Sequence, residues 1–444
     1  MISMNLHQAA AVTGGTLVGK PAQFHGVSSD SRSDCSGRLF IAIKGENFNG
    51  ENYCQQALDN GAVAVLVSSA QEVSCPQLIC DNALLSLSTL AKNWAKQCKT
   101  EIIAITGSNG KTTVKNMVKS IFSISYKCSA TQGNLNNEIG VPLTLCNISQ
   151  EDQYAIIEMG AAKLGDISWL ASLVNIHTAV ITNVSPAHIG RFGSYDNIVS
   201  EKSKIISNLS DESFAVVPKN SRHFEAWNND THGKIISFGM TDADVNIDSS
   251  IQFNLLFNGL KITDIKLPVA GKHNKINAAC ATAVALSFNI KLDDIKLGLE
   301  KFNPESGRLQ NLGLVNGIII INDSYNANPE SAKAAIDVLS ELDQPTTLVL
   351  GDMAELGIES VKWHQEIGEY ARINKITHLL TIGKDSIHTS QAYSDNPLHF
   401  NDIPTLSSHL LKNWNSYGTL LVKGSRSMQL EKLIDGLINA EKVA

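Results

Sequence analysis

The sequence predicts an α/β protein of three domains built on largely parallel sheets. Short apolar runs alternate with helical patterns along almost the whole chain, which is the order of parallel strands and crossover helices. The chain has 444 residues, and a prior of roughly 150 residues per domain gives about three domains. A hydrophobic content of 43% and a charged content of 18% are globular values, which exclude a disordered, collagen-like or coiled-coil chain.

The first domain is expected over residues 1–82 as a small α/β unit. Strand-like runs at 39–43 and 63–67 lie on either side of a helical segment at 53–59. A long amphipathic pattern at 83–98 follows, and it predicts the helix that enters the second domain.

The second domain is expected over residues 83–312, with a mostly parallel sheet. Between 242 and 268 the pattern changes to strand-rich alternation, which predicts an antiparallel part of the sheet. The apolar stretch 278–288 predicts a buried helix. The parallel strands are expected at 101–106, 154–158 and 178–184.

A Gly- and Asn-rich stretch at 307–317 marks the boundary to a third domain, expected over residues 313–444. Each strand-like run of this domain is followed by a helical segment, which indicates a doubly wound unit. The strands are expected at 318–321, 348–350, 379–382 and 420–422.

Charge, hydropathy and cysteine content restrict the class of protein. The net charge of −7 gives no basic face for nucleic acid, and no apolar run approaches the ~18–20 residues that cross a bilayer. The N-terminus lacks the pattern of a signal peptide, and none of the eight cysteines forms a C-x-x-C pair. We therefore expect a soluble, cytoplasmic monomer with reduced cysteines and without a nucleic-acid or membrane partner.

A phosphate-binding loop is predicted between the strand 102–106 and a helix start at Thr113. The segment between them reads Gly107-Ser-Asn-Gly110-Lys111-Thr112. Glycines let backbone N–H groups approach a phosphate, and the helix N-terminus adds partial positive charge. Lys111 would supply charge to the β- and γ-phosphates, and the Thr112 hydroxyl would bind Mg²⁺. The loop is shorter than the standard motif, which has a glycine where Ile105 stands.

Three polar segments are expected near this loop, because ligands bind at the carboxyl ends of parallel strands. Glu158 ends one strand and is either a solvated loop residue or a Mg²⁺ ligand. His188 follows the next strand and is either a ligand or, as is commoner for a lone histidine, a capping or packing residue. The amide-rich segment 133–137 is either a substrate loop or an ordinary turn, which Asn and Gly favour.

A series of segments carries a family resemblance along nearly the whole chain. They resemble the Mur ligases of peptidoglycan synthesis, whose phosphate loop is shortened in the same way. The late segments are most similar to members that add D-alanyl-D-alanine to UDP-N-acetylmuramoyl-tripeptide, and 28–50 is similar to their uridine-nucleotide domain. The segments after residue 100 are TGSNGKTT (106–113), GNLNNEIGVPLTL (133–145), IIEMGA (156–161), NVSPAHIG (183–190), GKHNKINA (271–278), GRL (307–309), NDSYNANPES (322–331), GDMAELG (351–357) and KGSRS (423–427).

The resemblance implies a uridine-nucleotide domain, a central phosphate-loop ATPase domain and a C-terminal Rossmann-like domain. It also implies the reaction, with ATP and Mg²⁺ as cofactors. ATP phosphorylates the tripeptide carboxylate, the amine of D-alanyl-D-alanine attacks the acyl phosphate, and phosphate leaves. The chemistry is consistent, because a carboxylate is a poor electrophile and phosphorylation gives it a leaving group. Lys111 and Mg²⁺ would neutralise charge as the phosphoryl group moves.

The family's metal and nucleotide residues have counterparts in this chain. Thr112 and Glu158 would hold one Mg²⁺, and His188 would contribute to a second metal position. Lys202 matches a lysine that the family carbamylates, although Ser203-Lys204 replace the usual Gly-Glu after it, so Lys204 is the alternative. The catalytic set is then Lys111, Lys202, His188 and Arg308, of which Arg308 reaches the γ-phosphate. The implied nucleotide-binding set is Gly107, Ser108, Asn109, Gly110, Lys111, Thr112, Thr113, His273, Asn274, Asn277, Arg308, Asp323 and Asn328.

The resemblance also implies substrate contacts and a motion. A hinge is expected within 303–317, where Gly307, Gly313 and Gly317 permit large dihedral changes, because the third domain must swing over the second to meet the nucleotide. The implied substrate residues are Ser29, Asp30, Ser31 and Arg32 for the uridine nucleotide, Asn134, Asn136 and Asn137 as substrate-side amides, and Tyr325 and Asn326 near the acceptor cleft.

Two other functions are alternatives. A folylpolyglutamate synthase-like ligase has the same phosphate loop, but the segment 28–50 and the late KGSRS argue against it. A non-catalytic nucleotide-binding module would not need the combination of Lys111, Glu158, His188 and Arg308.

Overall fold

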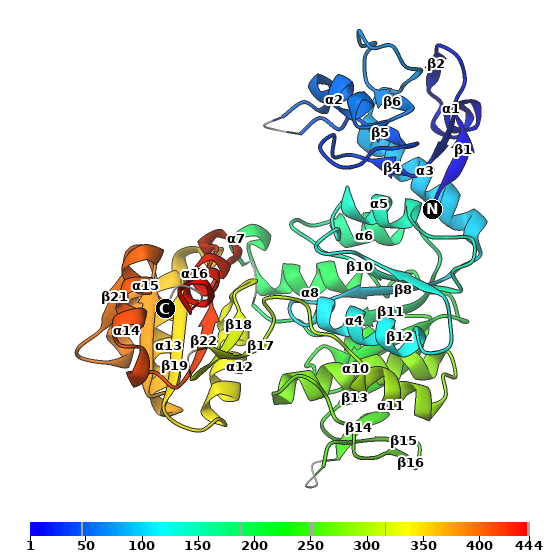
Figure 1. The fold of residues 1–444 in the computed structure, drawn as a ribbon. Helices are drawn as coiled ribbons and strands as arrows, with labels where there is room; N and C mark the ends of the chain where they lie inside the picture. The colour runs from blue at the N-terminus through cyan, green and yellow to red at the C-terminus, as the bar shows by residue number, and fades with distance from the viewer. Residues whose placement is uncertain (46–47, 187–188, 249–251, 316, 442–444) are drawn as a thin grey trace.

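The structure, a computed structural model, describes residues 1–45, 48–186, 189–248, 252–315 and 317–441. Its described strands form sheets of five, nine and six strands and one small two-stranded sheet. Each large sheet belongs to one of three bodies along the chain, the first above the second and the third beside it (Figure 1). The predicted α/β class with three domains and mostly parallel sheets is confirmed. Among the described residues, no helix is long and apolar enough to span a membrane.

The N-terminal body is a five-stranded sheet with flanking helices. Its elements are β1 (Ser3–Asn5), α1 (Leu6–Thr13), β2 (Thr16–Val18), β3 (Gln23–His25), β4 (Val27–Ser28), β5 (Leu39–Ile41), α2 (Cys54–Asp59), β6 (Ala64–Val67), β7 (Gln77–Ile79) and α3 (Ala83–Cys98). The strand order is β2-β7-β6-β5-β4, with β4 to β7 parallel. Every residue of β6 is buried, as expected for a central strand covered on both faces.

The central body is built on the nine-stranded sheet. Its strands are β8 (Glu101–Thr106), β9 (Cys128–Ala130), β10 (Tyr154–Glu158), β11 (Ile176–Ile181), β12 (Phe214–Pro218), β13 (Lys234–Gly239), β14 (Val245–Asp248), β15 (Asn254–Phe257) and β16 (Leu260–Ile262). The order is β16-β15-β14-β13-β12-β11-β8-β10-β9, in which β14, β15 and β16 pair antiparallel. The predicted antiparallel part therefore lies at one edge of the sheet.

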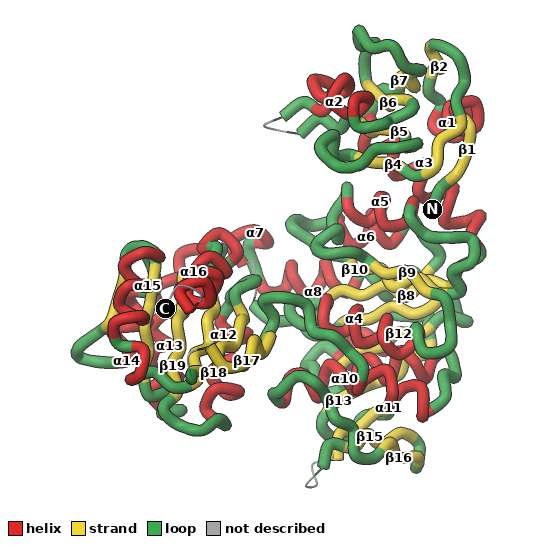
Figure 2. The backbone as a smooth tube through the Cα atoms, viewed as in Figure 1, coloured by secondary structure: helices red, strands yellow, loops and turns green. Residues whose placement is uncertain are grey.

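Helices cover both faces of this central sheet (Figure 2). They are α4 (Lys111–Phe122), α5 (Gly140–Cys146), α6 (Asp166–Ala171), α7 (Ile189–Phe192), α8 (Tyr195–Ser203), α9 (Phe224–Asp230), α10 (Lys272–Ser287) and α11 (Leu292–Glu300). In β8, Ile102 and Ala104 face a core shared with α3 and α5, whereas Ile103 and Ile105 face the core of α4 and α10. This alternation explains why residues 102–105 of β8 are all apolar: both faces of the strand are covered.

The C-terminal body carries the six-stranded sheet. Its elements are β17 (Gln310–Val315), β18 (Ile318–Asp323), α12 (Pro329–Ser340), β19 (Thr346–Gly351), α13 (Ser360–Ile373), β20 (His378–Ile382), α14 (Ile387–Tyr393), β21 (Leu398–Phe400), α15 (Ile403–Lys412), β22 (Thr419–Lys423) and α16 (Glu431–Glu441). The order is β17-β18-β22-β19-β20-β21, parallel except for the antiparallel hairpin of β17 and β18.

This hairpin corrects the extent of the predicted hinge. Gly313 lies within β17, where the register with β18 shifts, and Gly317 directly precedes β18. Both glycines have positive φ, of 83° and 82°, because the hairpin itself requires this conformation. The link between α11 and the third sheet is therefore shorter than 303–317 and ends before β17. The sheet begins at Gln310, inside the range expected for the second domain, and the domain limits stay a prediction.

Candidate functional site

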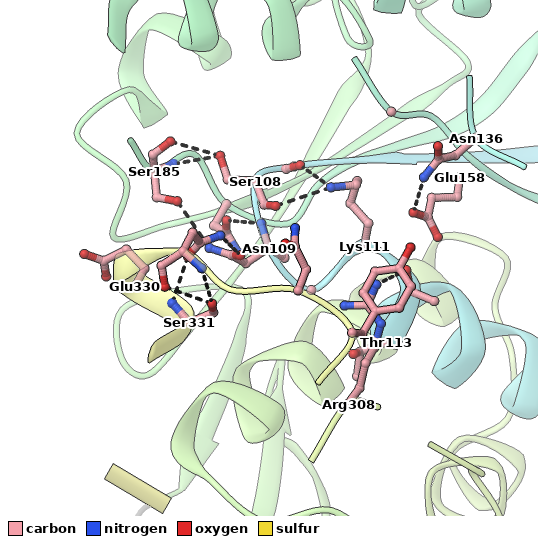
Figure 3. A pocket seen from close by; sticks show the side chains of 18 of the residues that line it. Ser108, Asn109, Lys111, Thr113, Asn136, Glu158, Ser185, Arg308, Glu330 and Ser331 are labelled. Carbon is pink, nitrogen blue, oxygen red and sulfur yellow. Dashed lines mark hydrogen bonds between the residues drawn. The ribbon is translucent and has the colours of Figure 1, made fainter. Parts of the chain in front are cut away.

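The phosphate loop leaves the middle of the central sheet and enters α4. Gly107 has φ of 150° and a Cβ there would lie 1.9 Å from Thr182 Oγ1; Gly110 has φ of 79° and a Cβ there would lie 2.7 Å from Asn277 Oδ1. Only glycine fits these two positions without a shift of the neighbouring strand end or helix. Lys111 folds back over the loop, and its Nζ donates to the carbonyl of Gly107 over 2.8 Å (Figure 3).

Residues just after β11, which were not among the predicted site residues, fix this loop. The backbone N–H of Asn109 donates to Asn183 Oδ1 over 2.9 Å, and that of Ser185 donates to Ser108 Oγ over 3.0 Å. The predicted strand 178–184 is wrong at both ends, because β11 spans Ile176–Ile181 and the chain then turns to hold the loop. A polar run directly after a strand beside the loop was the available signal.

A cavity of about 660 Å³ lies between the loop and the C-terminal body. It brings together most of the predicted site residues, although they come from distant parts of the chain. Those that line it are Gly107, Ser108, Asn109, Gly110, Lys111, Thr112, Thr113, Asn136, Asn137, Glu158, Lys202, His273, Asn274, Asn277, Arg308, Asp323, Tyr325, Asn326 and Asn328. Asn183, Ser185, Ser331 and Lys423 also line it and were not predicted.

Glu158 is a buried carboxylate at the end of β10, only 2% exposed. Asn136 Nδ2 donates to Glu158 Oε1 over 2.8 Å, whereas Oε2 is buried without a hydrogen-bond partner among the described residues (Figure 3). Burying a carboxylate oxygen that accepts no hydrogen bond lowers the stability of the fold unless a cation binds the oxygen. The alternative of a solvated loop residue does not fit this burial.

Lys202 projects into the cavity from α8 and is 6% exposed. Burial, and to a smaller extent the charge of Lys111, lowers the pKa of Lys202 to about 7. Lys204 follows the helix and is exposed, so it does not line the cavity. The preceding Glu201 faces α6 and accepts the backbone N–H of Ile167 over 2.6 Å, which fixes the rotation of α8. The predicted His188 lies outside the described residues.

Two side chains reach the phosphate loop from the C-terminal side. Arg308 Nη2 donates to Thr112 Oγ1 over 3.1 Å, and the guanidinium lies over the Tyr325 ring with 4.1 Å to its centroid. Asn328 caps α12 by accepting the N–H of Ser331, and its Nδ2 donates to Asn109 Oδ1 over 2.7 Å. The cap therefore orients the same side chain that bridges to the loop.

Asp323 and Lys423 form a buried ion pair on neighbouring strands of the third sheet. Lys423 Nζ donates to Asp323 Oδ2 over 2.7 Å and to the carbonyl of Asn326 over 3.0 Å. Asp323 Oδ1 accepts the backbone N–H of Leu309 over 3.1 Å. Asp323 was predicted to meet the nucleotide, but here both of its oxygens are engaged in holding the start of the third body.

His273, at the start of α10, lines the main cavity, and burial lowers the pKa of its imidazole. The remaining predicted residues that the structure describes lie outside this cavity. Asn134 does not line the main cavity but a neighbouring one of about 330 Å³. The predicted uridine group is not brought to either cavity: Arg32 and Asp30 form an exposed ion pair at 2.9 Å in the N-terminal body, and Ser31 Oγ donates to Gln56. Ser29, which directly precedes Asp30, is half-buried.

Comparison with known proteins identifies the family. Family models match residues 23–105 (Mur ligase family, catalytic domain), 105–285 (Mur ligase middle domain) and 307–426 (Mur ligase, glutamate ligase domain). The UDP-N-acetylmuramoyl-tripeptide–D-alanyl-D-alanine ligase of Escherichia coli K12 is 36% identical over 98% of this chain and 99% of its own length. The chain belongs to the Mur ligase family.

Solved Mur ligase structures share the fold. A crystal structure of MurF from Acinetobacter baumannii superposes with a TM-score of 0.90 at 31% identity and covers 98% of both chains. MurF ligase from Thermotoga maritima, solved in complex with ADP, has a TM-score of 0.83 and covers 94% of this chain and 98% of its own. At 23% identity the latter likeness concerns the fold alone. This Mur ligase therefore matches these relatives over nearly its whole length, including the N-terminal body.

Proposed function

We propose that this Mur ligase joins D-alanyl-D-alanine to UDP-N-acetylmuramoyl-tripeptide, with ATP converted to ADP and phosphate. The observation that carries the proposal is the main cavity, where a phosphate loop, a buried carboxylate and Lys202 of the central body face Arg308 and Asn328 from the C-terminal side. Relatives aligned over nearly the whole chain, in Escherichia coli and Bacillus subtilis among others, bear the name of this activity.

In this proposal the nucleotide binds at the Gly107–Thr113 loop. The start of α4 lines the cavity, and the backbone N–H groups at a helix N-terminus favour phosphate oxygens. Lys111 donates to the carbonyls of Gly107 and Ser108 in its own loop, and it is close enough to exchange these bonds for phosphate oxygens. His273, Asn274 and Asn277, at the start of α10, line the same cavity and complete the nucleotide site.

The residues present also fit Mg²⁺, the second cofactor that we propose. Glu158 Oε2 and Thr112 Oγ1 are oxygen donors of the kind that Mg²⁺ prefers, and Glu158 Oε2 is buried without a donor among the described residues. Mg²⁺ supplies positive charge beside the transferred phosphoryl group when it is bound. His188 is proposed as a further ligand.

Lys202 is proposed to carry a carbamate. Its amine attacks CO₂, an N–C bond forms and a proton leaves, so a cationic ammonium becomes an anionic ligand. This reaction needs the neutral amine, and burial that lowers the pKa to about 7 keeps much of the amine neutral at physiological pH.

The chain's own cations then act on the reaction. Lys111 and Arg308 neutralise charge as the tripeptide carboxylate takes the γ-phosphoryl group, which yields an acyl phosphate with a good leaving group. The dipeptide amine attacks the acyl carbon, phosphate departs with the bond electrons, and the amine loses a proton. Asn328 and Arg308 keep the C-terminal body close to the loop, so that water is kept away from the acyl phosphate.

The N-terminal body is proposed to bind the uridine nucleotide through Ser29, Asp30, Ser31 and Arg32. The Arg32–Asp30 pair is exposed, so its guanidinium is accessible to a diphosphate. We propose domains at 1–82, 83–312 and 313–444, and a cytoplasmic monomer, since both substrates are soluble metabolites.

Phosphate release from ATP, measured with and without each substrate, tests the function. Release should require both UDP-N-acetylmuramoyl-tripeptide and D-alanyl-D-alanine, and Lys111→Ala should abolish it. Lys119→Ala, on the exposed face of the same helix, is the matched control. Release without either substrate indicates a simple ATPase, and release with glutamate as acceptor indicates a folylpolyglutamate synthase-like enzyme.

A further inference from the structure

A second cavity of about 330 Å³ adjoins the first. The two cavities share Gly307 and Tyr325, which form part of the wall of each. The second is bounded by Asn134 of the central body, by the link at Glu305 and by the ends of strands in the C-terminal body. It is therefore an interdomain space that opens beside the phosphate-transfer site.

The second cavity carries both signs of charge. Arg426, just after β22, and Glu431, the first residue of α16, line it together with Glu305. Arg426 Nη1 donates to Glu431 Oε1 over 2.9 Å, which uses one of the five guanidinium N–H groups, and the Arg426 side chain is 64% exposed. Glu431 Oε2 is buried and has no hydrogen-bond partner among the described residues. The remaining N–H groups of Arg426 can therefore donate to a ligand, and Glu431 Oε2 can accept from it.

We propose that this second cavity binds the acceptor dipeptide and that Arg426 binds its free carboxylate, an inference that rests on the proposed ligase function. The acceptor is a small zwitterion with an amine at one end and a carboxylate at the other. Two residues span at most ~7 Å, so the carboxylate must be held close to the cavity in which the amine reacts. The amine end then lies at the Gly307–Tyr325 wall, facing the first cavity.

The other cations near this wall are committed elsewhere. Lys423 is 3% exposed and paired with Asp323, and Arg308 is turned into the first cavity toward Thr112. Glu431 holds Arg426 through Nη1, which orients its planar fork for a two-point contact with a carboxylate. Glu431 Oε2 and Glu305 give the same cavity acceptors for peptide N–H and ammonium groups.

The carboxylate of the dipeptide can be removed chemically, which gives a direct test. Steady-state kinetics are measured with D-alanyl-D-alanine and with D-alanyl-D-alaninamide, for the wild type, Arg426→Ala and Lys432→Ala. Lys432 is exposed, lies next to Glu431 and lines neither cavity, so its variant matches the change of charge. We expect the wild type to prefer the free acid by roughly 10–100-fold in kcat/KM, because the amide lacks the charge-assisted bonds.

Arg426→Ala should lose this preference. Its KM for the dipeptide should rise by roughly 10–100-fold, while its kinetics with the amide and its KM for ATP and for UDP-tripeptide stay close to the wild type. Arg426→Lys should recover part of the preference, and Lys432→Ala should retain all of it.

Three results would overturn the inference. One is an Arg426→Ala variant with the full preference for the free acid. Another is an equal loss with the acid and the amide, which would indicate a structural role through Glu431. The third is a rise in KM for UDP-tripeptide alone, which would place a tripeptide carboxylate at Arg426. A wild type that forms no ADP in response to any dipeptide refutes the ligase function instead, so the two failures are distinguishable.

Discussion

Arg308 donates a hydrogen bond from Nη2 to Thr112 Oγ1 over 3.1 Å, across 196 residues of sequence. The arginine lies in the link to the C-terminal body, and the threonine lies in the first turn of α4. Arg308 Nε is buried without a hydrogen-bond partner among the described residues. The guanidinium thus has an unused donor beside the phosphate loop, and a bound γ-phosphate would satisfy it.

Arg308→Ala should lower kcat by ~10²–10³-fold, because a positioned donor to the developing charge is lost. Thermal stability should change little, since one interdomain bond is removed. Arg308→Lys should be intermediate, because it keeps the charge but loses the planar fork. Single-turnover ADP formation and a melting curve measure both quantities.

The control for Arg308 is Arg372→Ala, an exposed arginine of α13 with the same change of charge. It should retain wild-type turnover. If Arg308→Ala also retains it, Arg308 does not act on the phosphate and its bond to Thr112 is only structural.

Lys202→Ala should be nearly inactive and partly rescued by formate or acetate, because a small carboxylate replaces the proposed carbamate. Lys204→Ala should remain active, since Lys204 is exposed and does not line the cavity. Turnover with 0–100 mM formate, an order-of-magnitude range set by weak anion binding, measures the rescue. The reverse behaviour of the two variants would place the carbamate at Lys204.

Local patterns were sufficient to predict the fold class and the loop. The apolar run of β8, the glycines of the loop and the helix that follows are contiguous in sequence, so their order was predicted correctly, although α4 begins at Lys111 and not at Thr113. The antiparallel edge of the central sheet followed from period-2 alternation in the same way.

Contacts between distant segments could not be predicted from such patterns. Asn183 holds Asn109 across the sheet, and Lys423 pairs with Asp323 across two parallel strands. Neither the spacing of these residues in the sequence nor their residue types predict that their side chains are in contact. The same limit explains why the hinge was predicted to be too long. A glycine such as Gly313 indicates flexibility in the sequence, but in the structure its positive φ belongs to the hairpin of β17 and β18.

His364 should make the C-terminal body sensitive to acid. The side chain is fully buried, Nε2 accepts the backbone N–H of Met353 over 3.1 Å, and Nδ1 donates to the carbonyl of Ser360 over 2.8 Å. Burial lowers the pKa of His364 below its ordinary value. The unfolded chain therefore binds the proton more readily, and the stability from neutral His364 is present above about pH 6.5 and is lost as the pH falls below it.

Hydrogen exchange of the 353–357 amides, corrected for intrinsic rates, measures this dependence. Protection should fall between about pH 7.5 and 5.5 in the wild type, on either side of the ordinary histidine pKa. It should change less in His364→Gln, which cannot titrate. His7→Gln, at an exposed helix position of the N-terminal body, should follow the wild type. Equal pH dependence in the wild type and His364→Gln would assign the effect to another group.

The C-terminal body should close further over the central body when nucleotide and both substrates bind. The described contacts between the two bodies include the Asn328–Asn109 bond and, at α7, an ion pair between Arg191 and Glu355. Closure would hold amine and acyl phosphate together, which can supply roughly 7–11 kcal/mol of the barrier. We expect the radius of gyration in small-angle scattering to fall on addition of an ATP analogue, UDP-tripeptide and D-alanyl-D-alanine.

Gly307 is the position in the link on which this motion should depend. Its φ is 77°, and a Cβ would lie 3.1 Å from the backbone nitrogen of Tyr325, so Gly307→Ala adds roughly 1–2 kcal/mol of backbone strain and a close contact at the hinge. Gly313→Ala is the matched control, because Gly313 has φ of 83° but no atom within 4 Å of an added Cβ and lies inside the hairpin. Gly307→Ala should lose turnover and the ligand-dependent decrease in radius, whereas Gly313→Ala should lose only stability. An unchanged radius in the liganded wild type, or the same behaviour in both variants, would contradict a hinge at Gly307.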